Sequence, residues 1–297
     1  MSSEVGSIAP APEGLVPEEL SEALIARLRA GDLDLPLLPS VATEVLELAR
    51  RADADAARLA EVLQRDQALA GHVMRLANSA SYAARVPIVS LPQAISRLGL
   101  TALRDMVVAV AVRGKVFHVP GCNDVVAPMW RHALATAYWA REIARARRSN
   151  VEAAFLCGLL HDVGSPVVLQ AILDVQCRRS VLYARPVIEY AILHFHGVFG
   201  GTLVAGWNMP PAVSDAILYH HDYSALERPS ESVLLTHLAD KMAAWMGLHD
   251  GYPRPPETEA TIAAAQVIED LNIYPDEVAQ LFGLRERIAA WVAEVEE

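Results

Sequence analysis

The sequence is poor in cysteine and aromatic residues, and it has no apolar run at its start. Its three cysteines, Cys122, Cys157 and Cys177, form no CxxC pair, which argues against a disulfide framework or a zinc ribbon and indicates reduced thiols. Residues 1–14 are polar and contain prolines, unlike a signal peptide. The longest apolar stretch, Ala153–Leu160, is far shorter than the ~20 residues of a membrane span. We therefore expect a cytoplasmic protein without membrane insertion.

Positive charge is also scarce, because 25 Lys and Arg residues face 36 Asp and Glu residues, for a formal net charge of −11. An acidic surface repels phosphate backbones, so we expect no bulk nucleic-acid binding, although a local basic pocket can still hold a small phosphate. Hydrophobic residues make up 53% of the 297 residues and aromatic ones only 6%. Such alanine-rich apolar sequence excludes a disordered chain and favours closely packed helices.

The apolar spacing predicts an all-α protein, because helical periodicity recurs and no segment alternates with period two. We expect four parts: a flexible lead at 1–14, an N-terminal helical lobe at 15–118, a second lobe at 119–250 and a C-terminal helical tail at 251–297. The tail is expected to form two helices, Thr258–Leu271 and Pro275–Val295, which pack on the second lobe or dock a partner.

Local chemistry predicts several helix boundaries. Pro17 is expected to begin the first helix and Gly31 to end it, and Asp55 and Asp66 have the side chains of N-caps. The pair Gly200–Gly201 inside a later helix indicates a close helix crossing.

The ten histidines are unevenly distributed: one lies before residue 117, and seven lie between residues 132 and 240. His161-Asp162 ends an apolar helix just before Gly164, and His220-His221 repeats this pattern at the end of another apolar helix. Burying two adjacent polar groups costs several kcal/mol unless something pairs with them. A divalent metal does so, because imidazole and carboxylate are its natural ligands.

Three further side chains complete a candidate metal site. Asp240 lies on an apolar helix with His237 one turn before it, and His132 and His196 each lie within an apolar helix. Taken alone, His132 or His196 is more often a hydrogen-bonded core histidine. Together with the two doublets they favour a site. The full set suits a pair of metals better than one ion, and it consists of His132, His161, Asp162, His196, His220, His221 and Asp240.

Short motifs occur in order over roughly residues 35–225. They are Leu38-Pro39, Asp66–Leu69, Leu76–Tyr82, Leu91–Ile95 with Leu98-Gly99, Trp130–His132, Gly158–Gly164, His196 with Gly200 and Trp207, Met209-Pro210 and His220-His221. In these residues the chain resembles the HDOD branch of the HD superfamily of metal-dependent phosphohydrolases. The resemblance implies a two-lobed helical protein of bacterial signalling, and most HDOD members are regarded as regulatory modules.

Many HDOD proteins have lost the metal ligands of their catalytic relatives, whereas this chain has a counterpart of every His and Asp ligand of the HD-GYP enzymes. That resemblance implies one or two divalent ions, iron, manganese or similar. Asp162 would bridge them, with His132, His161 and Asp240 on one side and His196, His220 and His221 on the other. Asp162, acting with a metal-bound water, is then the candidate catalytic residue.

The chain departs from the HD-GYP pattern at three places. Ser165 replaces the lysine that follows the HD-x-G turn, and Pro128 replaces an acidic residue one turn before His132. Asp222–Ala225 follows the histidine doublet where a GYP signature is expected, and we interpret Gly251–Pro253 as a coincidental match in a loop. The nearby basic residues that could offset phosphate charge are Arg131, Arg178 and Arg179.

Three hypotheses remain open at this point. The first is a regulatory module that binds a signalling protein partner or a nucleotide second messenger. The alternative is a metal-dependent phosphodiesterase acting on a cyclic dinucleotide or another nucleotide. The third is a purely structural metal. The oligomeric state is not indicated by the sequence.

Overall fold

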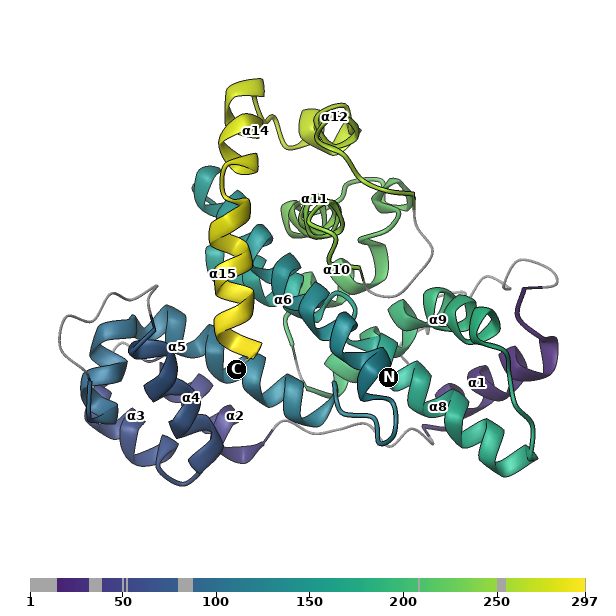
Figure 1. Ribbon diagram of the computed structural model, residues 1–297, viewed down its shortest axis with the longest axis horizontal. Helices are drawn as coiled ribbons and strands as arrows, with labels where there is room; N and C mark the ends of the chain where they lie inside the picture. The colour runs from purple at the N-terminus through teal and green to yellow at the C-terminus, as the bar shows by residue number, and fades with distance from the viewer. Residues whose placement is uncertain are drawn as a thin grey trace. The chain divides into compact units, whose positions relative to one another are not determined.

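The computed structural model describes residues 15–31, 39–49, 51, 53–79, 88–207, 209–249 and 255–296, and this part contains helices and no strand. The all-α prediction is confirmed (Figure 1). The flexible lead expected at 1–14 and the Gly251–Pro253 match lie outside the described residues. The helices are α1 Glu18–Ala30, α2 Ser40–Ala49, α3 Ala56–Leu63, α4 Gln67–Ala77, α5 Leu91–Lys115, α6 Asn123–Ala146, α7 Val151–Leu160, α8 Gly164–Arg179, α9 Arg185–Gly206, α10 Pro211–Tyr219, η2 Tyr223–Ala225, α11 Glu231–Trp245, α12 Glu259–Ala263, α13 Gln266–Asp270, α14 Pro275–Phe282 and α15 Arg285–Glu296.

The chain divides into two compact units. The histidine-bearing unit comprises residues 1–36 and 116–283, and the short-helix unit comprises 37–115 and 284–297. This division differs from the expected boundaries at both ends of the chain. Helix α1 belongs with the histidine-bearing helices, because Arg27 forms an ion pair of 2.9 Å with Asp174 of α8. Helix α15 belongs with the short helices, where an Arg113 Nη1–H donates to the Val295 carbonyl at 3.2 Å.

The short-helix unit follows its local sequence signals. Asp55 and Asp66 cap α3 and α4 as predicted, and their carboxylates accept backbone N–H bonds from Ala57 and from Ala68 and Leu69. Helix α5 is broken at Gly99, whose φ of 78° suits a residue without a Cβ atom. The apolar faces of α2 to α5 together form the core of this unit.

Close helix crossings build the histidine-bearing unit. A Cβ atom added at Gly158 of α7 would lie 2.8 Å from the Ala137 Cα atom of α6, and one at Gly164 would lie 1.9 Å from the His196 carbonyl oxygen of α9. A Cβ atom at Gly200 would lie 2.9 Å from a methyl carbon of Ile217, which confirms the predicted close crossing. These contacts bring the end of α7 and the middle of α9 together.

The C-terminal tail differs from the expected pair of long helices. The stretch Thr258–Leu271 breaks after Ala264, because Ala265 is extended with φ −72° and ψ 137° and serves as the N-cap of α13. The stretch Pro275–Val295 breaks after Phe282. Helices α12 to α14 therefore stay with the histidine-bearing unit, where the Trp245 and Phe282 rings pack with centroids 5.0 Å apart.

Two helical stretches among the described residues, Val151–Arg179 and Arg185–Gly206, are long and apolar enough to cross a membrane by length and composition. In their most apolar windows 78% and 44% of the residues are buried inside the protein, and core helices of folded proteins pass the same test. The first stretch is also interrupted between α7 and α8 by the turn that contains His161 and Asp162.

Candidate metal centre

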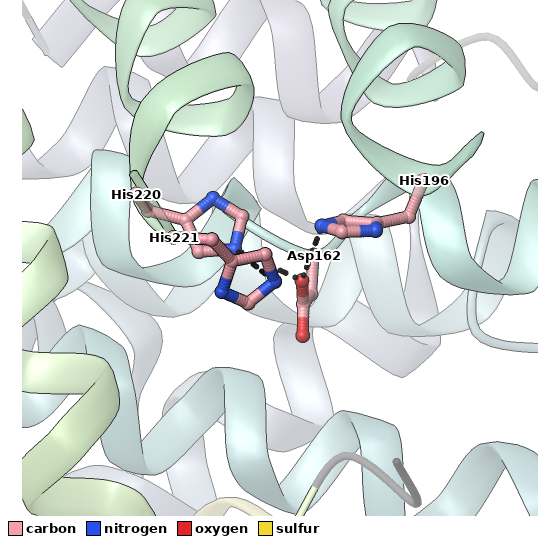
Figure 2. A group of neighbouring side chains, drawn as sticks. All are labelled: Asp162, His196, His220 and His221. Atoms are coloured by element: carbon pink, nitrogen blue, oxygen red, sulfur yellow. Dashed lines mark hydrogen bonds and ion pairs between the residues drawn. The ribbon is translucent and has the colours of Figure 1, made fainter. Parts of the chain in front are cut away.

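All seven candidate ligands come together within the histidine-bearing unit. The residues lie on α6 (His132), in the turn between α7 and α8 (His161, Asp162), on α9 (His196), just after α10 (His220, His221) and on α11 (Asp240). The donor atoms form two groups, within each of which they lie within 4.8 Å of one another. The first group is Asp162, His196, His220 and His221, whose side chains point toward one another in Figure 2, and the second is His132, His161 and Asp240.

Asp162 lies between the two groups. Its Oδ1 atom is 3.4 Å from His196 Nε2 and 3.5 Å from His220 Nε2. Its Oδ2 atom is 3.4 Å from His161 Nε2. One carboxylate oxygen thus faces each group, which is the arrangement that the predicted bridging role requires.

Asp240 lies next to the other two members of the second group. The Asp240 Oδ1 atom is 2.9 Å from His132 Nε2 and 3.9 Å from His161 Nε2, and the two Nε2 atoms are 3.2 Å apart. Its Oδ2 atom is 3.9 Å from Nδ1 of His221, whose side chain is 33% exposed. His221 therefore joins the two groups at the solvent side of the centre.

Backbone carbonyls fix the orientation of four of the imidazoles. A carbonyl only accepts hydrogen bonds, so the Nδ1 atom that contacts it carries the proton and the Nε2 atom of the neutral ring has a lone pair. Those lone pairs face the centre, as a first-row metal needs. The Nδ1–H bonds run from His132 to Leu248 (2.8 Å), from His161 to Gly158 (2.7 Å), from His196 to Leu193 (2.8 Å) and from His220 to Ile217 (3.0 Å).

This arrangement fits one or two divalent cations. The Nε2 lone pairs of His132 and His161 face each other across 3.2 Å, which is repulsive without a cation between them. Asp162 is fully buried, and neither of its carboxylate oxygens accepts a hydrogen bond from a described residue. A buried charge in that position is costly unless a cation compensates it.

Burial by itself raises the pKa of Asp162, but its interactions with His161, His220 and His196 outweigh burial and hold that pKa well below its usual range. The carboxyl group is therefore ionised at neutral pH, which is the form that binds a metal.

A cavity of about 320 Å³ opens beside the second group, and the sequence did not indicate it. It is lined by the ligands His221 and Asp240 together with Leu193, His237, Lys241, Ala244, Pro255 and Glu257. Lys241 Nζ is 2.8 Å from Glu257 Oε1. The sequence offered one signal for Lys241, which is its position directly after Asp240. The backbone of a residue next to an inward-facing ligand lies near the rim of the site.

The arginines proposed from the sequence do not line this cavity. Arg178 and Arg179 are exposed in the last turn of α8, about 20 Å along the helix from Gly164 at a rise of ~1.5 Å per residue. Arg179 instead donates to the Glu19 carbonyl of α1 at 3.2 Å. The sequence left open whether these two residues reach the metal site, because spacing in the sequence does not show which end of a helix faces the centre, and the structure places them away from it.

His237 braces the histidine doublet. Its Nδ1–H donates to the His220 carbonyl at 2.5 Å, and its ring contacts the Tyr223 ring edge to face with centroids 5.0 Å apart. Burial lowers the pKa of His237, so the ring is neutral at neutral pH. His237 therefore fixes the backbone between α10 and η2, where the two candidate ligands lie.

A family model for the HDOD domain matches residues 35–223. The chain belongs to the HDOD family. Among curated proteins it is 26% identical over 197 residues to an uncharacterized protein of Treponema pallidum (strain Nichols). That match covers 64% of this chain and 38% of the relative, so the chain spans well under half of the relative's length.

Solved structures share the fold. A proposed metal-dependent phosphohydrolase of Shewanella amazonensis SB2B superimposes with a TM-score of 0.71 at 20% identity, covering 93% of this chain and 98% of that one. A proposed signal transduction protein of Marinobacter aquaeolei VT8 gives a TM-score of 0.67 at 22% identity, covering 99% of this chain and 69% of that one. At these identities the likeness shows the fold, and the ligand role of the seven residues stays a prediction.

Proposed function

We propose that this protein is a regulatory HDOD module built around a divalent-metal centre, and that it acts by binding a ligand or a signalling protein partner. The observation that carries the proposal is the position of Asp162, an ionised and buried carboxylate with inward-facing imidazole Nε2 atoms on both sides. The centre would hold one or two ions of iron, manganese or a similar metal, through the seven residues named above.

The metal would supply positive charge and a Lewis acid at the base of the cavity. The chain's own residues orient and shield it: the carbonyl-bound histidines set its ligand directions, and the buried α6 and α7 keep water from its inner side. His221 and Asp240 meet the cavity, so a ligand there would approach the ions from this side.

A regulatory role is favoured over catalysis by two of the three departures from the catalytic pattern. Ser165 is buried at the start of α8, and Pro128 lies inside α6, so neither provides the cation or the acid found in catalytic relatives. Both groups of metal-competent side chains in the described part of the chain lie in the histidine-bearing unit. The short-helix unit would then serve recognition.

The second candidate function is metal-dependent phosphodiester hydrolysis on a cyclic dinucleotide or another nucleotide. The completeness of the His and Asp set favours it, and so does the Lys241 ammonium group at the cavity, which can offset phosphate charge.

Incubating iron- or manganese-loaded protein with cyclic dinucleotides and simple phosphodiesters separates the two functions. A regulatory module shows no turnover with any metal. Turnover that is lost in Asp162→Ala and kept in Asp276→Ala, a change of an exposed carboxylate on α14, would reject the regulatory proposal in favour of hydrolysis.

A further inference from the structure

The cavity beside the metal centre has the composition of a binding pocket for a small phosphorylated compound. Its volume of about 320 Å³ lies at the lower end of the ~300–1,000 Å³ typical of small-molecule pockets. Its lining includes the metal ligands His221 and Asp240, the polar side chains of Lys241 and His237, and the apolar side chains of Leu193 and Pro255. A charged head and an apolar body would both find matching surfaces there.

The charges favour an anion once metal is present. Two divalent ions would bring four positive charges against the two carboxylates of Asp162 and Asp240, and the imidazoles are neutral ligands. Lys241 adds a further positive charge on the cavity wall next to Asp240. A phosphate dianion in contact with Lys241 and the metal centre would offset most of this excess.

Glu257 forms an ion pair with Lys241, in the place that an anionic ligand would take. Its Oε1 atom is 2.8 Å from Lys241 Nζ, while its Oε2 atom accepts a hydrogen bond of 2.8 Å from the Thr261 hydroxyl group of α12. Both side chains are more than two-thirds buried, with 28% and 18% of their surface exposed. Glu257 thus competes with any anionic ligand for the same ammonium group.

We infer that this cavity binds a phosphate monoester of mononucleotide size, that Lys241 is its anion-binding residue, and that Glu257 is an internal competitor which releases Lys241 when the phosphate enters. The inference rests on the proposed metal centre, because the phosphate would contact both the ions and Lys241. It specifies a smaller ligand than a cyclic dinucleotide and a cation other than the arginines considered from the sequence.

Titration calorimetry with inorganic phosphate and with adenosine monophosphate, on metal-loaded full-length protein, tests the inference. Lys241→Gln should weaken binding about tenfold or more, Lys241→Arg should retain most of it, and Glu257→Gln should tighten it several-fold. The matched control is Arg147→Gln with Glu231→Gln, because that interhelical ion pair of 3.2 Å lies outside the cavity and should leave the affinity unchanged.

Elemental analysis and melting curves of every variant accompany the titration, so that a loss of metal or of fold is recognised. Equal phosphate affinity in wild type, Lys241→Gln and Glu257→Gln, all carrying metal, would overturn this inference and leave the metal centre intact. A wild-type protein that takes up no metal would instead overturn the proposed function, and this inference with it.

Discussion

Asp162 shows what a single buried residue contributes to this protein. Most buried carboxylates are compensated by arginine, lysine or backbone N–H groups, whereas the oxygens of this one lie 3.4–3.5 Å from imidazole nitrogens of described residues. In the absence of a cation its charge is compensated by those imidazoles, which hold its pKa low, and in the presence of a cation it is the central ligand. Removing its charge should therefore destabilise the protein most when metal is bound.

Asp162→Asn tests that dependence on metal. In metal-loaded protein the variant should melt several degrees below wild type, because it forfeits the stabilisation that ligand binding adds to the native state. In metal-free protein the loss should be smaller, because only the attraction between Asp162 and its neighbouring imidazoles is removed. Scanning fluorimetry with and without chelator measures both, and an equal loss in both states would contradict the account.

The cysteines give a second prediction at this scale. Burial raises the pKa of the Cys157 thiol to about 12, whereas Cys177 is exposed. The raised pKa stabilises the fold at pH values below about 9, and this contribution declines as the pH rises toward 12. At pH 8, iodoacetamide should modify Cys177 and leave Cys157 unmodified in the native state, as peptide mass spectrometry would show. Modification of both at similar rates would be inconsistent with this burial.

At the scale of helices, the turn between α7 and α8 positions the site. His161 and Asp162 lie between two helices that approach their neighbours through Gly158 and Gly164. Because the contact of Gly164 is with the backbone of His196, the same crossing sets the distance between the turn and the ligand on α9.

Gly164→Ala should therefore destabilise the protein by about 1–3 kcal/mol or more and lower its affinity for metal, since the added carbon collides with a carbonyl group that cannot rotate away. Gly71→Ala in α4 is the matched control, because nothing lies within 4 Å of its added carbon and alanine is the better helix former. Chemical unfolding measures both, and the account fails at this point if Gly164→Ala is as stable as wild type.

Several helix boundaries and the two histidine doublets could be predicted from the local sequence. Asp55, Asp66 and Gly31 could be predicted as helix caps, because a cap interacts with the backbone of its own helix end. The histidine doublets could be recognised because a polar pair at the end of an apolar helix is costly to bury without a partner. Lys241 and Leu248 could not be recognised in this way. Their importance depends on which side chain or carbonyl faces the centre from another helix, and that is a tertiary property.

At the scale of the whole molecule, sequence order and spatial grouping differ. Helix α1 belongs with helices more than a hundred residues later, and α15 belongs with α2 to α5. Continuous lobes were expected because apolar patterns show which face of a helix is buried but not which partner buries it. The family, in contrast, was recognisable, because its short motifs lie in order over residues 35–223.

The two units should respond differently to loss of metal. Among the residues that the structure describes, a chelator leaves buried ligands uncompensated only in the histidine-bearing unit, so amide hydrogen exchange should accelerate in α6 to α11 and remain unchanged in α2 to α5. Exchange mass spectrometry with and without chelator provides the comparison. If the chelator leaves amide protection unchanged in both units, the histidine cluster is a hydrogen-bonded core and not a metal site.

The most direct test of the metal centre is elemental analysis of protein purified without chelators from cells supplied with iron and manganese. We predict one to two divalent ions per chain in the wild type and almost none in Asp162→Ala or His161→Ala, with both variants still folded. A wild type that carries no metal above the level of these variants would contradict the account.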